Sequence, residues 1–163
     1  MTHMSLKQKI MTIPIVSKFL LNHYAPFKGA GITINKIDLK NYHIQVKMPL
    51  TPKNRNVVGV HFGGSLYAMV DPFYMLLLMH HLGNKYIVWD KAAAIHFLSP
   101  GHGTVYADIR LDFQEIEHIK MLAENYAPVI RNYSLNIFDE AGLRIAEVQK
   151  TLYIRRKKSA SKK

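Results

Sequence analysis

The sequence predicts an α+β fold in which a curled antiparallel sheet wraps around one long buried helix. Two observations support this prediction. The most apolar segment, residues 66–82, is too long for a typical strand and carries apolar side chains on every face, so it needs an enclosing surface. The other regular elements are mainly strands that alternate apolar and polar residues, and one face of a sheet built from them can enclose the helix.

The chain is expected to begin with a helical extension over residues 1–29. Residues 1–24 read as two helical pieces, and Pro14 suits the first turn of the second piece because a proline there loses no intrahelical hydrogen bond. Pro26 and the glycines within 29–31 end this helical stretch. The extension therefore precedes the sheet.

Two strands precede the buried helix and four follow it. The first strand opens at Ile32, residues 43–48 alternate in polarity, and the proline- and asparagine-rich stretch 49–61 reads as a loop. Gly83 and Asn84 stop the helix. The elements after it are, in chain order, a strand over 86–98, a turn over 99–103, an alternating strand over 105–113, a short amphipathic helix over 115–124, and a hairpin of 129–138 with 143–154.

Composition limits the protein to one domain, expected over residues 1–154. The chain has 163 residues, of which 48% are hydrophobic and 20% charged. Its net charge is +11, but six of the 22 basic residues lie in 155–163; without them 16 basic residues remain against 11 acidic ones, a charge of +5. We expect 155–163 to be a disordered basic tail. It either keeps the protein soluble or attracts an anionic partner, such as nucleic acid, a membrane surface or substrate phosphates.

The residue types present also exclude several kinds of chemistry. There is no cysteine, which removes disulfides, cysteine-ligated zinc, iron–sulfur clusters and thiol catalysis. The nine histidines show no metal-site spacing, so no metal is expected. The first residues lack a secretory signal, and Asp71, Pro72 and His80–His81 interrupt the apolar segment before it reaches the length of a membrane span. We therefore expect a cytoplasmic protein with no membrane-spanning segment.

Asp71 is the anomaly within the apolar segment. A buried carboxylate without a partner costs several kcal/mol. Two interpretations are open: Asp71 accepts hydrogen bonds at a break that Pro72 makes in the helix, or it is a catalytic group. Further along the chain, Trp89-Asp90-Lys91 reads as a local ion pair in mid-strand.

Gly63 and Gly64 form a second feature, at the start of the apolar segment. Glycines let a ligand approach the backbone closely, and the first N–H groups of a helix lack partners and carry partial positive charge. This arrangement suits a polarised carbonyl or a developing oxyanion, although a glycine pair also suits tight packing alone. Asp71 follows Gly64 by seven residues, about two helical turns, so both features are expected on one side of the helix.

Residues 56–71 together resemble the hot-dog-fold thioesterases. The segment reads Asn-Val-Val-Gly-Val-His-Phe-Gly-Gly-Ser-Leu-Tyr-Ala-Met-Val-Asp. The likeness is closest to the phenylacetate-pathway type, and the wording also looks like the uncharacterised YiiD C-terminal-like branch. In the phenylacetate type an asparagine stands seven residues before a Gly-Gly pair, and an aspartate seven residues after its second glycine. That spacing is met here by Asn56, Gly63, Gly64 and Asp71.

The resemblance extends over residues 30–154, because the predicted order of elements matches the hot-dog fold, in which a curled antiparallel sheet surrounds one helix. One position departs from the pattern. Phe62 stands directly before the glycine pair, where the phenylacetate type has a histidine, and His61 lies one position earlier. This difference affects the expected orientation of the substrate more than the expected identity of the catalytic base.

The resemblance implies a thioesterase acting on a small to medium acyl-CoA, assembled as a homodimer or a dimer of dimers with sites shared across the interface. Asp71 would activate water or attack the thioester directly, and Asn56 would hold the water or the thioester. The thioester carbonyl would lie on the backbone N–H of Gly64 or Ser65. The expected substrate-binding set is His61, Phe62, Gly63, Gly64 and Ser65. Coenzyme A enters only as part of the substrate, so no cofactor is implied, and its phosphates would meet basic residues.

Three other functions stay open at this point. The first is an acyl-CoA-binding or regulatory module that keeps the fold without efficient catalysis, which Phe62 in place of histidine favours. The second is a hot-dog dehydratase or hydratase: His61-Phe62-Gly63-Gly64 resembles the His-Phe-Pro-Gly of those enzymes, but their catalytic acid lies further along the helix than Asp71. The third is nucleic-acid binding through the tail, which no interleaved aromatic and basic residues support. We therefore expect no specific nucleic-acid partner.

Overall fold

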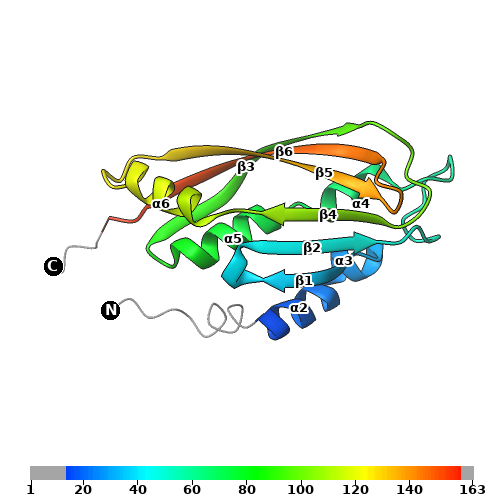
Figure 1. Ribbon diagram of the computed structural model, residues 1–163, viewed down its shortest axis with the longest axis horizontal. Coiled ribbons are helices and arrows are strands. Elements are labelled where there is room, and N and C mark those ends of the chain that lie inside the picture. Colours follow the sequence, from blue (N-terminus) through cyan, green and yellow to red (C-terminus); the bar gives the residue numbers. More distant parts are fainter. Residues whose placement is uncertain (1–13, 159–163) are drawn as a thin grey trace.

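Six antiparallel strands form one curled sheet in the computed structural model, which describes residues 14–158 (Figure 1). The strands are β1 (Thr33–Asp38), β2 (His43–Met48), β3 (Tyr86–Phe97), β4 (Val105–Arg110), β5 (Val129–Asp139) and β6 (Arg144–Arg156). Their order across the sheet is β1-β2-β4-β5-β6-β3. The helices are α2 (Pro14–His23), α3 (Ala25–Ala30), α4 (Gly63–Ala68), α5 (Phe73–Leu82) and α6 (Phe113–Leu122), and a 3₁₀ turn, η1, spans Leu39–Asn41.

The single helix expected over 66–82 is present as two helices, α4 and α5, with a turn between them at residues 69–72. Pro72 accounts for the interruption, because it lacks an N–H group and disfavours helical geometry at the residue before it. Helix α5 begins directly after Pro72, and the N–H of Leu76 donates to the carbonyl of Pro72 at 2.9 Å. Both helices lie against the inner face of the sheet, so the predicted architecture of a curled antiparallel sheet around a buried helical segment is confirmed (Figure 1).

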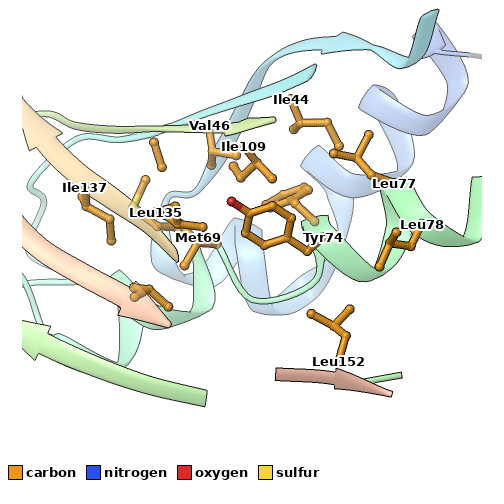
Figure 2. Close-up of a cluster of buried hydrophobic side chains, with 14 of the residues drawn as sticks. Ile44, Val46, Met69, Tyr74, Leu77, Leu78, Ile109, Leu135, Ile137 and Leu152 are labelled. Carbon is orange, nitrogen blue, oxygen red and sulfur yellow. The ribbon is translucent and has the colours of Figure 1, made fainter. Parts of the chain in front are cut away.

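The core forms between this helical segment and the concave face of the sheet. Figure 2 shows side chains of the segment surrounded by side chains from four strands. The labelled members are Met69, Tyr74, Leu77 and Leu78 from the helical segment, Ile44 and Val46 from β2, Ile109 from β4, Leu135 and Ile137 from β5, and Leu152 from β6. All of them are buried, and each fully buried aliphatic side chain contributes about 1.5–3 kcal/mol relative to exposure.

The two edges of the sheet differ. The β1 edge is covered by α2: the N–H of Ile34 donates to the Asn22 side chain at 2.7 Å, and Lys18 donates to the carbonyl of Asn35 at 2.7 Å. The β3 edge is bare among the described residues, since β3 pairs only with β6. Much of β3 is exposed, including Trp89 at 57%. An uncovered strand of this length invites pairing with another chain.

The ends of the chain bear on two sequence expectations. β6 runs through Arg156, so the first two residues of the 155–163 segment continue a strand, and the N–H of Lys157 donates to the carbonyl of Lys85 at 2.8 Å. Residues 159–163 of the expected tail, and residues 1–13 of the expected helical extension, lie outside the described residues. Within residues 14–158, no helix reaches the length and apolarity needed to cross a bilayer.

Candidate functional site

A pocket of about 430 Å³ opens at the start of α4. It brings together three of the predicted site residues, Asn56, His61 and Gly63. Most of the remaining wall is apolar and comes from the end of β3 and the turn after it. The other lining residues are Val60, Leu66, Phe97, Leu98, Ser99, Pro100 and Gly101. The combination of apolar walls with a few polar groups is typical of a site for a small organic ligand.

Asn56 organises the loop that forms one wall of this pocket. Its side-chain oxygen accepts from the N–H groups of Val58 and Val60, both at 3.1 Å. Its own N–H donates to the carbonyl of Val60 at 2.8 Å, and Gly59, whose φ is +90°, completes the turn. The amide NH₂ of Asn56 has no acceptor among residues 14–158, so this donor is the part of the side chain that is left for a ligand.

His61 lies buried in the pocket wall, with 3% of its surface exposed. Its Nε2 lies 2.8 Å from the carbonyl oxygen of Gly103, and because that oxygen can only accept, Nε2 carries the proton. Nδ1 then presents a lone pair, and this buried atom has no partner in the described part of the chain. Burial lowers the pKa of His61 and outweighs the opposing effect of the Gly103 hydrogen bond. The ring is therefore neutral at pH 7 and offers an acceptor.

The two glycines at the start of α4 are held between aromatic rings. A Cβ at Gly63 would lie 2.7 Å from Cζ of Phe97, and one at Gly64 would lie 2.5 Å from Cε1 of Phe62. A side chain at either position would have to displace the ring that it meets, so tight packing is one reason for both glycines. Phe62 is 56% exposed and does not line the pocket.

Some backbone N–H groups at the start of α4 have no hydrogen-bond acceptor within residues 14–158. The N–H of Ser65 donates to the carbonyl of Phe62 at 2.9 Å, which removes it from the expected set of carbonyl-binding donors. The N–H groups of Gly63 and Gly64 have no acceptor among the described residues. Two adjacent unpaired donors thus lie at the start of α4, where Gly63 lines the pocket, and they are the groups available to a carbonyl oxygen.

Asp71 lies elsewhere, in the turn between α4 and α5, and joins a cluster of polar side chains. Its Oδ1 accepts from the hydroxyl of Tyr67 at 2.5 Å and from Nζ of Lys150 at 2.6 Å. Lys150 also donates to the Tyr67 oxygen at 3.0 Å, and its Nζ lies 3.0 Å from Oδ1 of Asp90. That last contact is an ion pair without hydrogen-bond alignment, because Asp90 Oδ1 is buried and has no hydrogen-bonding partner in the described chain. Asp90 thus faces Lys150, and the ion pair with Lys91 expected from the sequence is not formed.

The cluster combines one ammonium with two carboxylates. The Lys150 side chain is fully buried, whereas the side chains of Asp71 and Asp90 are 42% and 27% exposed. Burial alone would lower the pKa of Lys150, but its hydrogen bonds to Asp71 and Tyr67 and the neighbouring carboxylate of Asp90 raise it above the ordinary value. Burial and the neighbouring Asp71 raise the pKa of Tyr67. At neutral pH Lys150 is therefore charged, and Tyr67 stays protonated as a donor.

Lys150 and Tyr67 are the cluster members that sequence reasoning missed, and Asp90 was expected to pair with Lys91. A signal for Lys150 was present: in β6 it lies in phase with the inward-facing Val148 and Leu152, so the period of two puts a lysine on the buried face. A buried lysine needs a carboxylate partner, and Asp71 is the carboxylate that interrupts the apolar segment.

None of the four residues of the Asp71 cluster lines the pocket. Along β3, Asp90 contacts the cluster and Phe97 lines the pocket, and these residues are seven positions apart, about 23 Å of extended strand. Among the described residues, no group of three or more histidine, aspartate or glutamate side chains could hold a metal ion.

Comparison with known proteins identifies both the family and the fold. The family model described as "domain of unknown function (DUF4442)" matches residues 13–154. No curated protein matches the sequence. Three solved structures have a similar fold at low identity, which establishes the hot-dog fold and no more.

The first of these structures is a protein of unknown function from Pseudomonas aeruginosa that is named a probable thioesterase; it is 19% identical with a TM-score of 0.80, and the match covers 88% of this chain and 95% of that one. A thioesterase from Haemophilus influenzae is 18% identical with a TM-score of 0.63, covering 87% and 91%. A protein with unknown function from Chlorobaculum tepidum is 16% identical with a TM-score of 0.70, covering 93% and 95%.

Proposed function

The chain belongs to the DUF4442 family, and we propose that it is an acyl-CoA thioesterase that hydrolyses the thioester of a small to medium acyl-CoA. The main support for the proposal is the environment of Asp71. Its carboxylate is partly exposed, and one of its oxygens is held by the fully buried ammonium of Lys150. The shared fold with solved thioesterases supports the same reaction class.

The pocket supplies the groups that a thioester needs. Its apolar walls fit an acyl chain, and the unpaired N–H groups of Gly63 and Gly64 fit the thioester carbonyl oxygen. The free NH₂ of Asn56 can hold the carbonyl or the attacking water. Nδ1 of His61 can accept a hydrogen bond from a donor in the substrate. Together these groups would orient the carbonyl and stabilise the negative charge that develops on its oxygen.

We place the complete site between two copies of the chain. The open β3 edge would pair with the same edge of a second copy, running antiparallel across a two-fold axis. The midpoint of the segment from Asp90 to Phe97 lies between Ala93 and Ala94. A two-fold axis through this point would place Phe97, at the pocket of one copy, beside the same strand's Asp90 in the second copy. The exposed alanines at 92–94 leave room for close approach. Asp71 of one copy would then complete the pocket of the other.

In this assembly Asp71 acts through Oδ2, because Oδ1 already accepts two hydrogen bonds. As a base it removes a proton from water, and the hydroxide attacks the thioester carbon. The tetrahedral intermediate then expels coenzyme A as the thiolate, which takes up a proton, and the acyl group leaves as the carboxylic acid. As a nucleophile, the Asp71 carboxylate would instead attack the thioester carbon, form an anhydride with the acyl group and expel coenzyme A as the thiolate, which takes up a proton from water. Water would then cleave the anhydride, which restores the carboxylate and releases the carboxylic acid.

A panel of acyl-CoA thioesters of different chain lengths, assayed for release of free thiol, tests the function. We expect turnover of at least one small or medium acyl-CoA, with no added metal or cofactor. Tight acyl-CoA binding without thiol release would instead identify an acyl-binding module. The absence of both binding and release across the panel would contradict the proposal.

The basic residues after β6 give a further prediction for the same assay. Arg155 and Arg156 lie opposite the Tyr86 end of β3, whereas the pocket lies at the Phe97 end, roughly 36 Å away along the strand. Antiparallel pairing of two β3 strands would bring the basic end of one copy toward the pocket of the other, where coenzyme A phosphates would lie. Neutralising Arg155, Lys157 and Lys158 with glutamine should therefore raise KM and leave kcat unchanged, because a remote charge stabilises substrate and transition state equally.

The effect on KM should shrink as salt is added, since solvated charges are screened beyond about 8 Å at physiological ionic strength. Substitution keeps β6 intact, which deletion of 155–163 would not. The matched control neutralises three lysines near the other sheet edge, Lys36, Lys40 and Lys47, and should leave KM unchanged. A KM that stays the same at low and high salt in the first variant would show that the basic segment serves solubility only.

A further inference from the structure

We propose that Lys150 is the positioning residue for Asp71: its buried ammonium holds Oδ1 of the carboxylate, so that Oδ2 alone faces the reaction. The inference rests on the proposed function and adds to it a residue from the opposite end of the sequence. Lys150 lies 79 positions after Asp71 and reaches it from the inner face of β6.

Stability does not explain a lysine at this place. The side chain is fully buried, and the neighbouring inward positions of β6, Val148 and Leu152, are apolar. Moving an ammonium out of water carries a desolvation penalty, and replacing a whole buried ion pair by apolar residues of similar volume often leaves a protein as stable or more stable. The sequence nevertheless has a charged residue on the buried face of β6, opposite the one carboxylate of the apolar segment.

The hydrogen bonds define the orientation of Asp71. Oδ1 accepts from Nζ of Lys150 at 2.6 Å and from the Tyr67 hydroxyl at 2.5 Å, and Tyr67 in turn accepts from Lys150 at 3.0 Å. These three groups form a closed ring of hydrogen bonds, which fixes the plane of the carboxylate. No described residue donates to Oδ2. One oxygen is thus anchored, and the other remains free on a side chain that is 42% exposed.

The local backbone provides little orientation by itself. Asp71 lies in the turn between two short helices, and within residues 14–158 its backbone makes one hydrogen bond outside regular elements, from its N–H to the carbonyl of Tyr67 at 3.1 Å. The anchor therefore has to come from the sheet, and β6 supplies it from a strand paired on both sides, with β5 and with β3. Misplacing a reacting group by about 1 Å can lower the rate on the order of 10²-fold. Holding the Asp71 carboxylate in place should therefore increase the rate of hydrolysis.

Asp90 completes the arrangement by balancing charge during the reaction. When Asp71 accepts a proton, or bonds to the acyl group, its negative charge is lost and a buried ammonium would be left unpaired. Asp90, 3.0 Å from Nζ, keeps a negative charge beside Lys150 at that moment. Lys150 can therefore stay protonated and in place throughout turnover.

Substitution of Lys150 by methionine tests the inference, because methionine matches the unbranched lysine side chain as far as Cε and removes the charged Nζ. We expect kcat to fall 10- to 100-fold with KM within about threefold of wild type. The melting temperature should fall, because Asp71 and Asp90 lose their shared cation, but the protein should still fold because these side chains are 42% and 27% exposed. The matched control is Lys36→Met, which removes an exposed lysine from its pair with Asp38 at 3.4 Å and should not change kcat.

Lys150→Ala with added ethylammonium gives a readout that a merely structural role would not produce. The small cation can enter the space left by the side chain, so it should restore kcat at least tenfold, whereas sodium chloride of equal ionic strength should not. A folded Lys150→Met protein with wild-type kcat would overturn the inference.

A wild-type protein that hydrolyses no acyl-CoA would contradict the proposed function rather than the positioning role. In that case a crystal structure of Lys150→Met decides the positioning role. We expect the Asp71 carboxylate to leave its position beside Tyr67 or to adopt more than one orientation. A carboxylate that keeps its single position without Lys150 would overturn the inference.

Discussion

Asp71→Asn should lower kcat by about 10²- to 10⁴-fold, the range typical of a lost general base. The amide is nearly isosteric with the carboxylate and can still accept from Lys150 and Tyr67, but it can neither take a proton from water nor attack a thioester. Steady-state kinetics on the best acyl-CoA substrate measures the effect. Retention of more than about a tenth of wild-type turnover would remove Asp71 from the catalytic role.

The fold of this variant should survive. Removing one partner of a buried ion pair typically costs about 3–5 kcal/mol, but here Asp90 remains beside the ammonium and the Asp71 side chain is 42% exposed, so we expect a loss of about 1–2 kcal/mol. Thermal unfolding followed by circular dichroism measures it. Loss of the folded state in Asp71→Asn would instead favour the structural interpretation of the carboxylate.

Ala93→Arg should convert the protein to a monomer and remove most of its activity. Ala93 is exposed on the bare β3 edge next to the proposed two-fold axis, so the substitution would bring two bulky like charges together at the centre of the interface. A site that needs Asp71 from one copy and the pocket of another cannot form in a monomer. Sedimentation and kinetics on the same samples measure both effects.

Ala141→Arg is the matched control, because Ala141 is equally exposed but lies in the turn between β5 and β6, away from β3. It should leave both assembly and activity unchanged. A wild-type protein that sediments as a stable monomer of 18.7 kDa at micromolar concentration would contradict a site shared between copies. So would a monomeric Ala93→Arg protein with full activity.

Periodicity in the sequence was sufficient to predict the fold. The apolar segment 66–82 requires enclosure, and the period-two segments around it supply a sheet, because burial of apolar surface dominates folding and depends on residue type and spacing alone. The sequence predicts a break in the helix at Pro72, but it does not predict that a complete turn divides the segment into two helices. That outcome depends on whether tertiary packing stabilises two short helices in place of one.

The site was only partly predictable, because its parts meet through sheet register. Asn56, His61 and Gly63 are close in sequence, and the structure does bring them to one pocket. The pairing of β6 with β3 brings Lys150 close to Asp90, and a shift of one residue in β6 would turn the lysine to the other face, away from Asp71. Sequence spacing cannot supply that register.

Mixing two inactive variants tests most directly whether the site is assembled from two copies. Asp71→Asn keeps an intact pocket, whereas Gly63→Val fills the pocket and keeps Asp71, since a Cβ at Gly63 already lies 2.7 Å from the Phe97 ring. In an equal mixture of refolded chains, half of the dimers are mixed, and each mixed dimer holds one intact site. We expect recovery of about a quarter of wild-type activity. Mixed dimers that form, as seen by native mass spectrometry, but show no activity beyond that of the separate variants would contradict a site assembled from two copies.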